Sequence, residues 1–327
     1  MSKPLLSIEE LSVKFETDAG SVQAVDNVSL SVSEGETLAI VGESGSGKSV
    51  TALSILQLLG EAGRIEGGRI WFKNRDLVRE SVDNIRQIRG DQIAMIFQEP
   101  MSSLNPVLTI GKQVAEPIWL HRKESWDSAY ERAGELLKRV SIPDAHQRLN
   151  DYPHQFSGGM RQRVMIAMAL QCNPSLLIAD EPTTALDVTI QAQILDLMMD
   201  LKDKRKDAAI LLITHDLAVI AETCDRVIVM YGGVIQEIAP IEELFKNPVH
   251  PYTKALMDSI PKMDLKAKRL KALKGMVPSI LELDDGCKLC SRFDPEECAC
   301  KGTKVEPDLI EISKGHFARV HQDLITQ

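Results

Sequence analysis

Short apolar runs alternate with segments of helical spacing along most of the chain. The runs at 175–180 and 209–214 are continuous and apolar, which is typical of buried parallel strands, and 189–204 between them has helical spacing. Further strands are predicted at 7–15, 22–32, 38–41, 64–73 and 92–98. A strand, a helix and a second strand in succession predict a right-handed unit that binds ligands at the carboxyl ends of its strands. The chain is therefore predicted to be an α/β protein.

The pattern becomes helical between about residues 100 and 170. Apolar positions recur at i, i+3, i+4 and i+7 in 128–140, and 109–121 also reads as a helix. Strand patterns return after this region. A helical subdomain inserted into an α/β domain is the simplest account.

Composition is that of an ordinary globular protein. The 327 residues are 44% hydrophobic and 26% charged, with a formal net charge of −9 and a pI near 5.4. This acidic balance disfavours a nucleic-acid partner, and none is expected. The sequence has no uninterrupted apolar run of about 18 residues, and its first residues do not resemble a signal peptide, so we expect a cytosolic chain.

The stretch from Gly42 to Ser49 places glycines, serines and a lysine between an apolar run and a helix-compatible run at 51–59. Gly42, four residues, then Gly47, Lys48 and Ser49 is the spacing of a P-loop. Its backbone N–H groups would wrap phosphate oxygens, its lysine would reach the terminal phosphates, and its hydroxyl would ligate magnesium. A flexible turn is the alternative, but a strand before and a helix after favour a phosphate site at a helix N-terminus. The motif predicts binding of a nucleoside triphosphate.

Two adjacent carboxylates, Asp180 and Glu181, end the apolar run at 175–180. After a P-loop, the first can complete a magnesium shell and the second can polarise the water that attacks the γ-phosphate. The alternative is a strand-end turn with two solvated acids, which the independent P-loop makes less favourable.

A third motif is FSGGMRQR at 156–163, before the apolar run that starts at Val164. Ser157 is suited to cap a helix, and the two glycines that follow ease the entry of the chain. This structural interpretation is compatible with a phosphate site, because free N–H groups at a helix start bind anions.

These motifs, with the histidine of ITHD at 213–216, occur in an order that resembles the ATP-binding subunit of an ABC transporter over about residues 5–260. The resemblance implies a P-loop NTPase fold: an ABC-type nucleotide-binding domain at 1–245 with an antiparallel β subdomain and a helical subdomain at about 100–170, then a small cysteine-containing extension at 246–327. It implies ATP and Mg²⁺ as the ligands and ATP hydrolysis as the activity. One departure is Met160, where the family signature usually has glutamine, and this puts that side-chain contact in doubt.

The resemblance also implies a role for each motif residue. Phe15 would stack on adenine, Asp187 would form the D-loop, and Gln98 would join magnesium and the attacking water to the coupling surface. Taken alone, Phe15 is an ordinary core aromatic and Gln98 a strand-end polar residue, so only the combination of motifs favours these roles. The implied nucleotide-binding residues are Phe15, Gly42, Ser44, Gly45, Ser46, Gly47, Lys48, Ser49 and Val50, with Ser157, Gly158 and Gly159 of the signature.

The resemblance implies four catalytic residues: Glu181, His215, Gln98 and Lys48. Glu181 would be the base or the group that orients the water, and His215 would be the switch histidine. His215 taken alone is a satisfied structural histidine. The implied magnesium ligands are Ser49, Gln98 and Asp180. In this family the signature contacts ATP bound by another subunit, so a second ATP-binding subunit is implied, and a heterodimer is expected.

The branch of the family is suggested by three segments, at 101–111, 140–160 and 247–261. They resemble ATP-binding subunits of oligopeptide, dipeptide and nickel importers. The resemblance implies a peripheral subunit at the cytoplasmic face of the cell membrane, with two transmembrane permeases and an extracytoplasmic peptide-binding protein as partners, docked through the surface between Gln98 and about Pro117. A nickel or other small-solute importer is the first alternative, and a soluble non-transport ABC ATPase is the second. The HPYT stretch at 250–253 taken alone is a turn between two helices.

Four of the six cysteines, Cys287, Cys290, Cys298 and Cys300, lie within fourteen residues of the extension. Four close thiolates can bind one tetrahedral zinc or a [4Fe–4S] cluster, and the segment is too short and polar to build a core without such a staple. A [4Fe–4S] cluster is favoured because family members with the extension often bear cysteine motifs, although this chain departs from their usual spacing. Zinc and free thiols remain open. Cys172 and Cys224 are predicted core residues.

Overall fold

The computed structural model describes residues 4–18, 20–99, 103–184, 186–259, 286–295 and 297–321. The chain divides into two compact units that alternate along the sequence. The first unit comprises residues 1–6, 32–36 and 72–213, and the second comprises 7–31, 37–71 and 214–327. The predicted boundary near residue 245 does not coincide with this division and stays a prediction.

The first unit contains three parallel strands in the order β6, β7 and β8. They are β6 (Ile93–Ile96), β7 (Leu176–Asp180) and β8 (Ala209–Ile213), and all their residues are buried. Helix α8 (Val188–Lys204) connects β7 to β8. This is the predicted strand–helix–strand unit, and Asp180, paired with Ile213, stands at the carboxyl end of β7.

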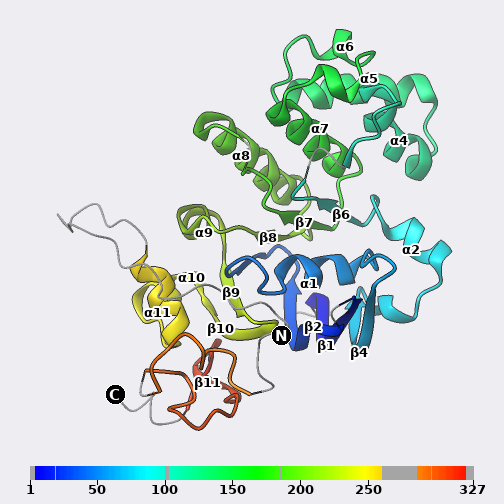
Figure 1. The fold of residues 1–327 in the computed structure, drawn as a ribbon. Coiled ribbons are helices and arrows are strands. Elements are labelled where there is room, and N and C mark those ends of the chain that lie inside the picture. The colour runs from blue at the N-terminus through cyan, green and yellow to red at the C-terminus, as the bar shows by residue number, and fades with distance from the viewer. Residues whose placement is uncertain are drawn as a thin grey trace. The chain divides into compact units, whose positions relative to one another are not determined.

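Helices make up most of the rest of the first unit, and α4, α5, α6 and α7 gather in its teal to green part in Figure 1. Ser125 caps α5 and Ser157 caps α7 through their side chains, as expected for serine at a helix start. Both helical segments predicted at 109–140 are present, which confirms the helical insertion. The helices are α2 (Val82–Ile88), α4 (Ile110–Arg122), α5 (Trp126–Arg139), α6 (Ala145–Arg148) and α7 (Gly158–Leu170), with the 3-10 turns η1 (Leu77–Arg79) and η2 (Pro153–Gln155) and the two-residue strand β5 (Arg75–Asp76).

Most of the second unit is built from two groups of strands. One contains β2 (Gly20–Ser33), β1 (Pro4–Thr17, whose first residues belong to the first unit) and β4 (Gly63–Phe72), in that order. In the other, β3 (Thr37–Val41) is parallel to β9 (Arg226–Tyr231), and β10 (Val234–Pro240), β12 (His316–Arg319) and β11 (Leu309–Ser313) follow in antiparallel pairs. Its helices are α1 (Lys48–Ile55), α9 (Leu217–Thr223), α10 (Ile241–Lys246) and α11 (Pro251–Asp258).

The predicted strands are present, with bounds that differ by a few residues. One expectation needs correction, because the helix-compatible run at 51–59 is helical only to Ile55. Gln57 has a left-handed φ of 52°, and the N–H of Leu58 donates to the carbonyl of Leu53, which closes the end of the helix.

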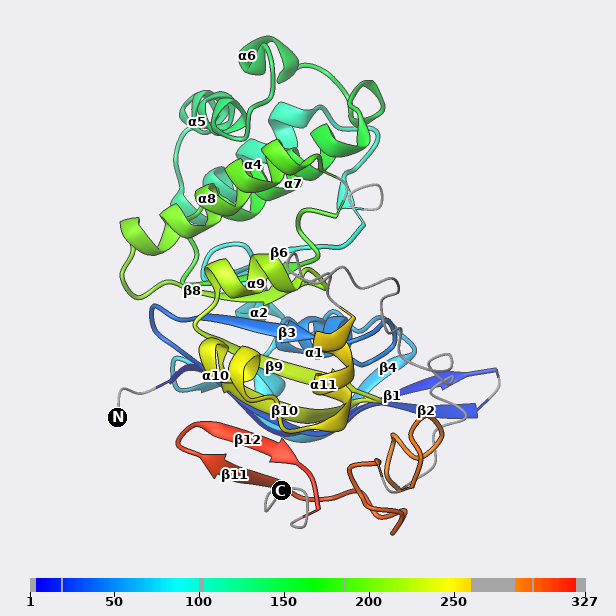
Figure 2. The same cartoon turned by 90° about the vertical axis from the view of Figure 1, so that its left-hand side faces the viewer.

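The C-terminal hairpin β11–β12 lies beside β10, as Figure 2 shows. The carboxylate of Glu237 on β10 is fully buried and contacts His316 Nε2 of β12 at 2.7 Å. Glu237 also accepts the backbone N–H groups of Val249 and His250. Burial alone would raise the pKa of Glu237, but these hydrogen bonds outweigh it and hold the pKa below its ordinary value. One buried carboxylate thus joins the hairpin to the start of α11.

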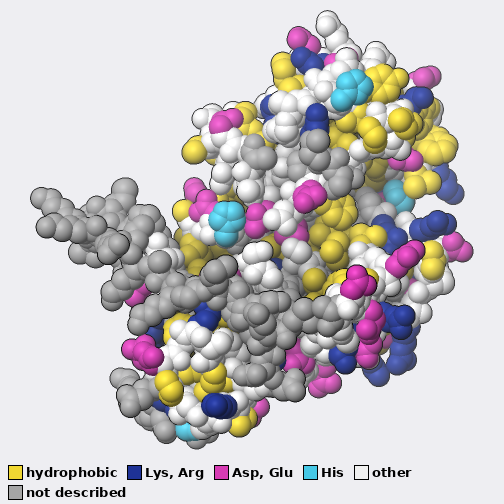
Figure 3. Space-filling model, in the orientation of Figure 1, with side chains coloured by type: hydrophobic (Ala, Val, Ile, Leu, Met, Phe, Trp, Pro, Cys, Tyr) yellow, Lys and Arg dark blue, Asp and Glu magenta, His cyan; other side chains and the backbone are white. Residues whose placement is uncertain are grey.

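No helix in the described part of the chain is long and apolar enough to cross a membrane. Basic and acidic side chains are interspersed on the face drawn in Figure 3. Large hydrophobic side chains are exposed in the helical part of the first unit, and they include Val107, Leu108, Trp119, Leu120 and Trp126.

Candidate nucleotide-binding site and cysteine cluster

The predicted phosphate-binding loop lies in the second unit, between the buried strand β3 and helix α1. Lys48 is the first residue of α1, and its ammonium donates to the carbonyls of Gly42 and Glu43 at 2.8 Å each and to Ser46 Oγ at 3.1 Å. The loop therefore curls around its own lysine. The loop ends at the N-terminus of α1, where backbone N–H groups and the helix dipole favour a phosphate.

Two glycines of this loop are required by sterics. Gly42 has φ +153°, and an added Cβ would lie 2.1 Å from the carbonyl oxygen of Met230. Gly47 has φ +97°, and its Cβ would lie 2.7 Å from the carbonyl oxygen of Ala24. The backbones of β9 and β2 thus lie so close to the loop that only glycine fits at these two positions.

Glu43 is the loop residue that the sequence analysis missed. Its backbone N–H donates to the phenol oxygen of Tyr252 at 3.0 Å, and its carboxylate pairs with the guanidinium of Arg292. The side chain of Arg292 is only 3% exposed. Tyr252 belongs to the HPYT stretch and Arg292 to the cysteine segment. Both segments of the extension therefore contact the P-loop through Glu43. The only sign of this role in the sequence is a glutamate inside the P-loop motif. Its partners could not be identified, because they lie over 200 positions away.

In the first unit, Asp180 is the buried last residue of β7, and Glu181 follows it. The N–H of Glu181 donates to the carbonyl of Ile213 at 2.8 Å, and Thr184 Oγ1 donates to Glu181 Oε2 at 3.0 Å. Glu181 has a φ of +48°, a conformation that a side chain other than glycine or asparagine rarely adopts. Such local strain occurs at functional sites, where the surrounding structure holds it.

The signature segment opens α7. Ser157 Oγ accepts the N–H of Met160 at 3.3 Å, which confirms the predicted cap. Gly158 is exposed, and apart from its chain neighbours and the backbone of its own helix an added Cβ would meet no atom within 4 Å. Further along the helix, Gln162 Nε2 donates to the carbonyl of Pro182 at 2.6 Å. The signature helix is thereby tied to the loop that carries Glu181.

Other predicted site residues occupy strand ends or helix caps. Phe15 is half-buried in β1, Gln98 is exposed after β6, and His215 is exposed after β8. Asp187 caps α8 by accepting the N–H of Ile190 at 3.1 Å. The first unit holds Gln98, Ser157, Asp180, Glu181 and Asp187, and the second holds Phe15, the P-loop and His215.

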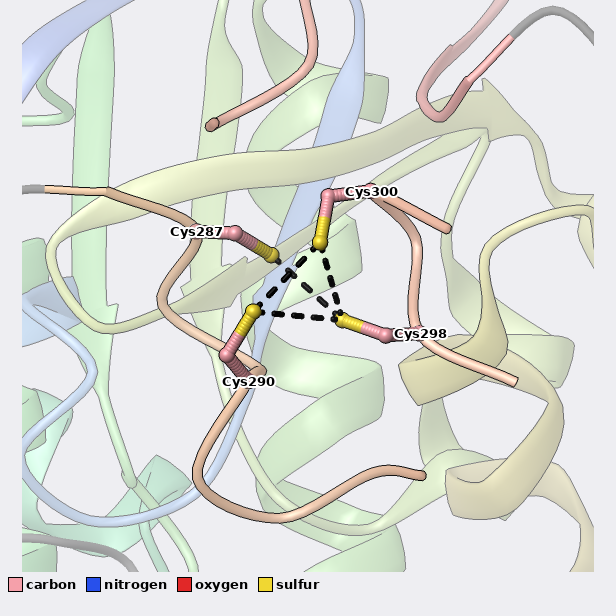
Figure 4. Close-up of side chains that lie close together, drawn as sticks. All are labelled: Cys287, Cys290, Cys298 and Cys300. Carbon is pink, nitrogen blue, oxygen red and sulfur yellow. Dashed lines mark hydrogen bonds between the residues drawn. The ribbon is translucent and has the colours of Figure 1, made fainter. Parts of the chain in front are cut away.

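The four cysteines of the extension come together, as Figure 4 shows. The Sγ of Cys298 lies 3.5 Å from the Sγ atoms of Cys287 and Cys300 and 3.9 Å from that of Cys290, and Cys290 lies 3.4 Å from Cys300. The hydrogen bond between Cys298 and Cys287 holds the pKa of Cys298 below its ordinary value and the pKa of Cys287 above it. Cysteines bind a metal as thiolates, so a bound metal would compete with this hydrogen bond.

The other two cysteines, Cys172 and Cys224, are buried in the core, as predicted. Burial raises the pKa of Cys172 to about 11.

Comparison with known families gives two matches. The model described as ABC transporter matches residues 25–184, and that of the oligopeptide/dipeptide transporter C-terminal region matches residues 236–300. A peptide ABC transporter ATP-binding protein of Sinorhizobium fredii is 52% identical over 96% of this chain and 93% of its own. The dipeptide transport ATP-binding protein DppD of Bacillus subtilis is 50% identical over 90% of this chain and 88% of its own.

Two solved structures are similar to the cassette part. A dimeric ATP-binding cassette in a post-hydrolysis state with ADP and Pi has a TM-score of 0.65 and 29% identity, over 72% of this chain and 98% of that one. CbiO1 of Clostridium perfringens, from the transporter complex cbiONQ, has a TM-score of 0.60 and 27% identity, over 75% of this chain and 92% of that one.

Proposed function

Because the chain belongs to the family of ABC transporter ATP-binding subunits with an oligopeptide/dipeptide C-terminal region, we propose that it hydrolyses ATP to drive the import of di- or oligopeptides across the cytoplasmic membrane. The activity is that of an ATPase. The observation that carries the proposal is the loop curled around Lys48, in a chain about half identical to a dipeptide transport subunit over most of its length.

The residues available for hydrolysis divide into those that bind and those that act on water. Lys48 and the loop N–H groups would hold the β- and γ-phosphates, and Phe15 would stack on the adenine. Glu181 would orient the attacking water and accept its proton, and His215 would stabilise charge on the transferring phosphoryl group. The oxygen donors of Ser49, Gln98 and Asp180 suit Mg²⁺, which neutralises phosphate charge when it is bound.

A second ATP-binding subunit would complete the site. Ser157 and Gly158 are exposed and leave space for a ligand carried by another chain. We propose that they contact the γ-phosphate bound by that subunit, which a heterodimer would supply. Two permeases and an extracytoplasmic peptide-binding protein would form the rest of the importer. This arrangement puts the chain at the cytoplasmic face of the membrane.

The four cysteines would hold a metal centre, because soft thiolates suit both zinc and iron–sulfur clusters. Four ligands about 2.3 Å from one zinc ion lie about 3.8 Å from one another, and the sulfurs of Cys298 and its neighbours are 3.5–3.9 Å apart. In a [4Fe–4S] cluster each thiolate binds a different iron, so the sulfurs would have to move apart. The four sulfurs lie close enough to share one zinc ion, and a [4Fe–4S] cluster would use the same four ligands at wider spacing. Metal analysis and visible absorption of the purified chain distinguish the two.

The proposed function is tested by isolating the tagged chain from detergent-solubilised membranes. Recovery of two multispanning permeases, a second ATPase and a peptide-binding protein would support the importer, and the ligand of the binding protein would identify the cargo. Bound nickel on that protein would select the small-solute alternative. Recovery of soluble partners alone, with full ATPase activity in their presence, would contradict transport.

A further inference from the structure

Glu43 is held at both its backbone and its side chain by residues far along the chain. Tyr252 accepts its N–H at 3.0 Å, and Arg292 donates to its carboxylate through both terminal guanidinium nitrogens. The guanidinium also lies 5.7 Å from the ring centroid of Tyr231, and the rings of Tyr231 and Tyr252 are 4.8 Å apart. These four residues form a closed ring of contacts, which we name the Glu43 clamp.

The clamp acts on the part of the loop that encloses Lys48. The carbonyl of Glu43 accepts hydrogen bonds from Lys48 Nζ at 2.8 Å and from the N–H of Ser46 at 3.2 Å. A shift of Glu43 would therefore displace two of the groups that set the curvature of the loop. Because phosphate binding depends on this curvature, the clamp can influence nucleotide affinity without touching the nucleotide.

The cysteine segment determines where Arg292 lies. The N–H of Arg292 donates to the carbonyl of Leu289 at 2.9 Å, and the N–H of Cys290 donates to that of Cys287 at 3.2 Å. These bonds make one compact turn in which the first two cysteines lie five and two positions before the arginine. Leu289, within this turn, is buried. A metal that fixes Cys287 and Cys290 would fix the backbone of Arg292 as well.

We propose that Arg292 is a positioning residue of the ATP site, through which the four-cysteine centre stabilises the phosphate-binding form of the P-loop. The proposal rests on the proposed function, since it takes the loop as the ATP site and the cysteines as a metal site. The side chain of Arg292 is almost fully buried, and the carboxylate of Glu43 compensates its charge. Loss of the metal frees the turn, Arg292 withdraws, and the loop is held less firmly.

The first test measures the Kd of the full chain for a fluorescent ATP analogue in the presence of magnesium. Arg292→Ala should raise this Kd about tenfold, within the usual range for coupling between sites, and Arg292→Lys should recover part of the loss. Arg319→Ala is the matched control: Arg319 lies in the same extension, donates to the carbonyls of Ile235 and Pro307, and pairs with Glu306 at 3.8 Å. None of these contacts involves a residue of the Glu43 clamp. Arg319→Ala should lower thermal stability but leave the Kd close to that of the unchanged chain.

The outcomes separate this inference from the proposed function. If the unchanged chain does not bind the analogue, the proposed function fails. The positioning role is refuted if the unchanged chain binds the analogue and Arg292→Ala has the same Kd as the unchanged chain. It is also refuted if the Kd of Arg292→Ala is no higher than that of Arg319→Ala. Should Arg292→Ala fail to fold, Glu43→Gln removes the carboxylate charge from the loop side and should raise the Kd in the same way.

The second test concerns the metal itself. Cys298→Ser should lower the metal content of the purified chain and raise the Kd for the analogue, and adding Arg292→Ala should raise it no further, because both changes act through one contact. Cys172→Ser is the control cysteine. Since coupling is reciprocal, a bound analogue should slow the loss of metal to a chelator from the unchanged chain. Loss of metal with an unchanged Kd for the analogue would refute the coupling between the cysteine centre and the nucleotide site.

Discussion

The phenol oxygen of Tyr252, at the start of α11, accepts the backbone N–H of Glu43 in the P-loop at 3.0 Å. Tyr252 is fully buried, and its ring packs against that of Tyr231. A partly buried N–H that loses its acceptor costs free energy, so this bond stabilises the loop in its present shape. The HPYT stretch is thus both a helix start and a support for the nucleotide loop.

Tyr252→Phe should remove this bond and keep the ring packing. We expect a loss of about 1 kcal/mol in the free energy of unfolding, together with weaker binding of a fluorescent ATP analogue. Tyr130→Phe is the control, because Tyr130 donates to the carbonyl of Leu149 at 3.1 Å in the first unit. It should cost similar stability and leave nucleotide affinity unchanged. Equal affinities for both variants would show that Tyr252 only stabilises the fold.

Glu181→Gln should abolish turnover while ATP still binds. The amide keeps the shape of the side chain but cannot accept the proton of the attacking water, so phosphate release should fall about 100-fold or more. ATP-bound dimers should accumulate and be visible by size-exclusion chromatography. Glu222→Gln, at an exposed position of α9, is the control. Rapid phosphate release by the Glu181 variant would remove this residue from the proposed chemistry.

Gly42→Ala should distort the loop. The new Cβ would lie 2.1 Å from the carbonyl oxygen of Met230, and the φ of +153° is unfavourable for alanine. We expect a loss of at least about 2 kcal/mol in unfolding free energy and no measurable ATP binding. Gly67→Ala, where an added Cβ meets nothing within 4 Å, should leave ATP binding intact. Urea unfolding and analogue titration of both variants provide the check.

His250 should make stability depend on pH. Burial lowers the pKa of His250 from 6.5 to about 3, while the nearby Glu237 opposes the shift. The folded protein keeps this histidine neutral, whereas the unfolded chain binds a proton below pH 6.5. The contribution of His250 to the free energy of unfolding is therefore complete above pH 6.5. It decreases by about 1.4 kcal/mol for each pH unit below that value.

His250→Asn tests this dependence. Asparagine does not titrate and can still cap α11, where His250 Nδ1 accepts the N–H of Tyr252. Urea unfolding between pH 7 and pH 5 should show a shallower loss of stability in the variant, even if its stability at pH 7 is lower. The exposed His154→Asn is the control. An identical slope in the unchanged chain and in His250→Asn would contradict the assignment.

Val107→Glu should weaken attachment to the permeases. Val107 is 77% exposed and lies in the segment predicted to dock them, so a charge there would oppose an apolar contact. Fewer permeases should co-purify, while the isolated chain keeps its ATP affinity. Val82→Glu, at a position 67% exposed outside that segment, should not change recovery. Unchanged recovery with Val107→Glu would place the docking surface elsewhere.

Local patterns determined most of the secondary structure and the chemistry of the motifs. The buried strand β7 follows from a continuous apolar run, and the P-loop from its glycine and lysine spacing, because both depend on neighbours in the sequence. The cysteine cluster was also readable, since its four thiols lie within one short segment. The end of α1 was not, because the left-handed turn at Gln57 interrupts a run that is helix-compatible by composition.

Only the tertiary structure decided how the extension meets the P-loop. Glu43 and Arg292 are 249 positions apart, and neither glutamate nor arginine is distinctive by itself. The guanidinium of Arg292 lies over the ring of Tyr231, which packs against Tyr252, and the arginine side chain is buried there. The same holds for Glu237 of β10, whose buried carboxylate contacts His316, 79 positions away. Sequence patterns carry local propensity and motif chemistry, whereas the compensation of a buried charge depends on which distant residues the fold brings together.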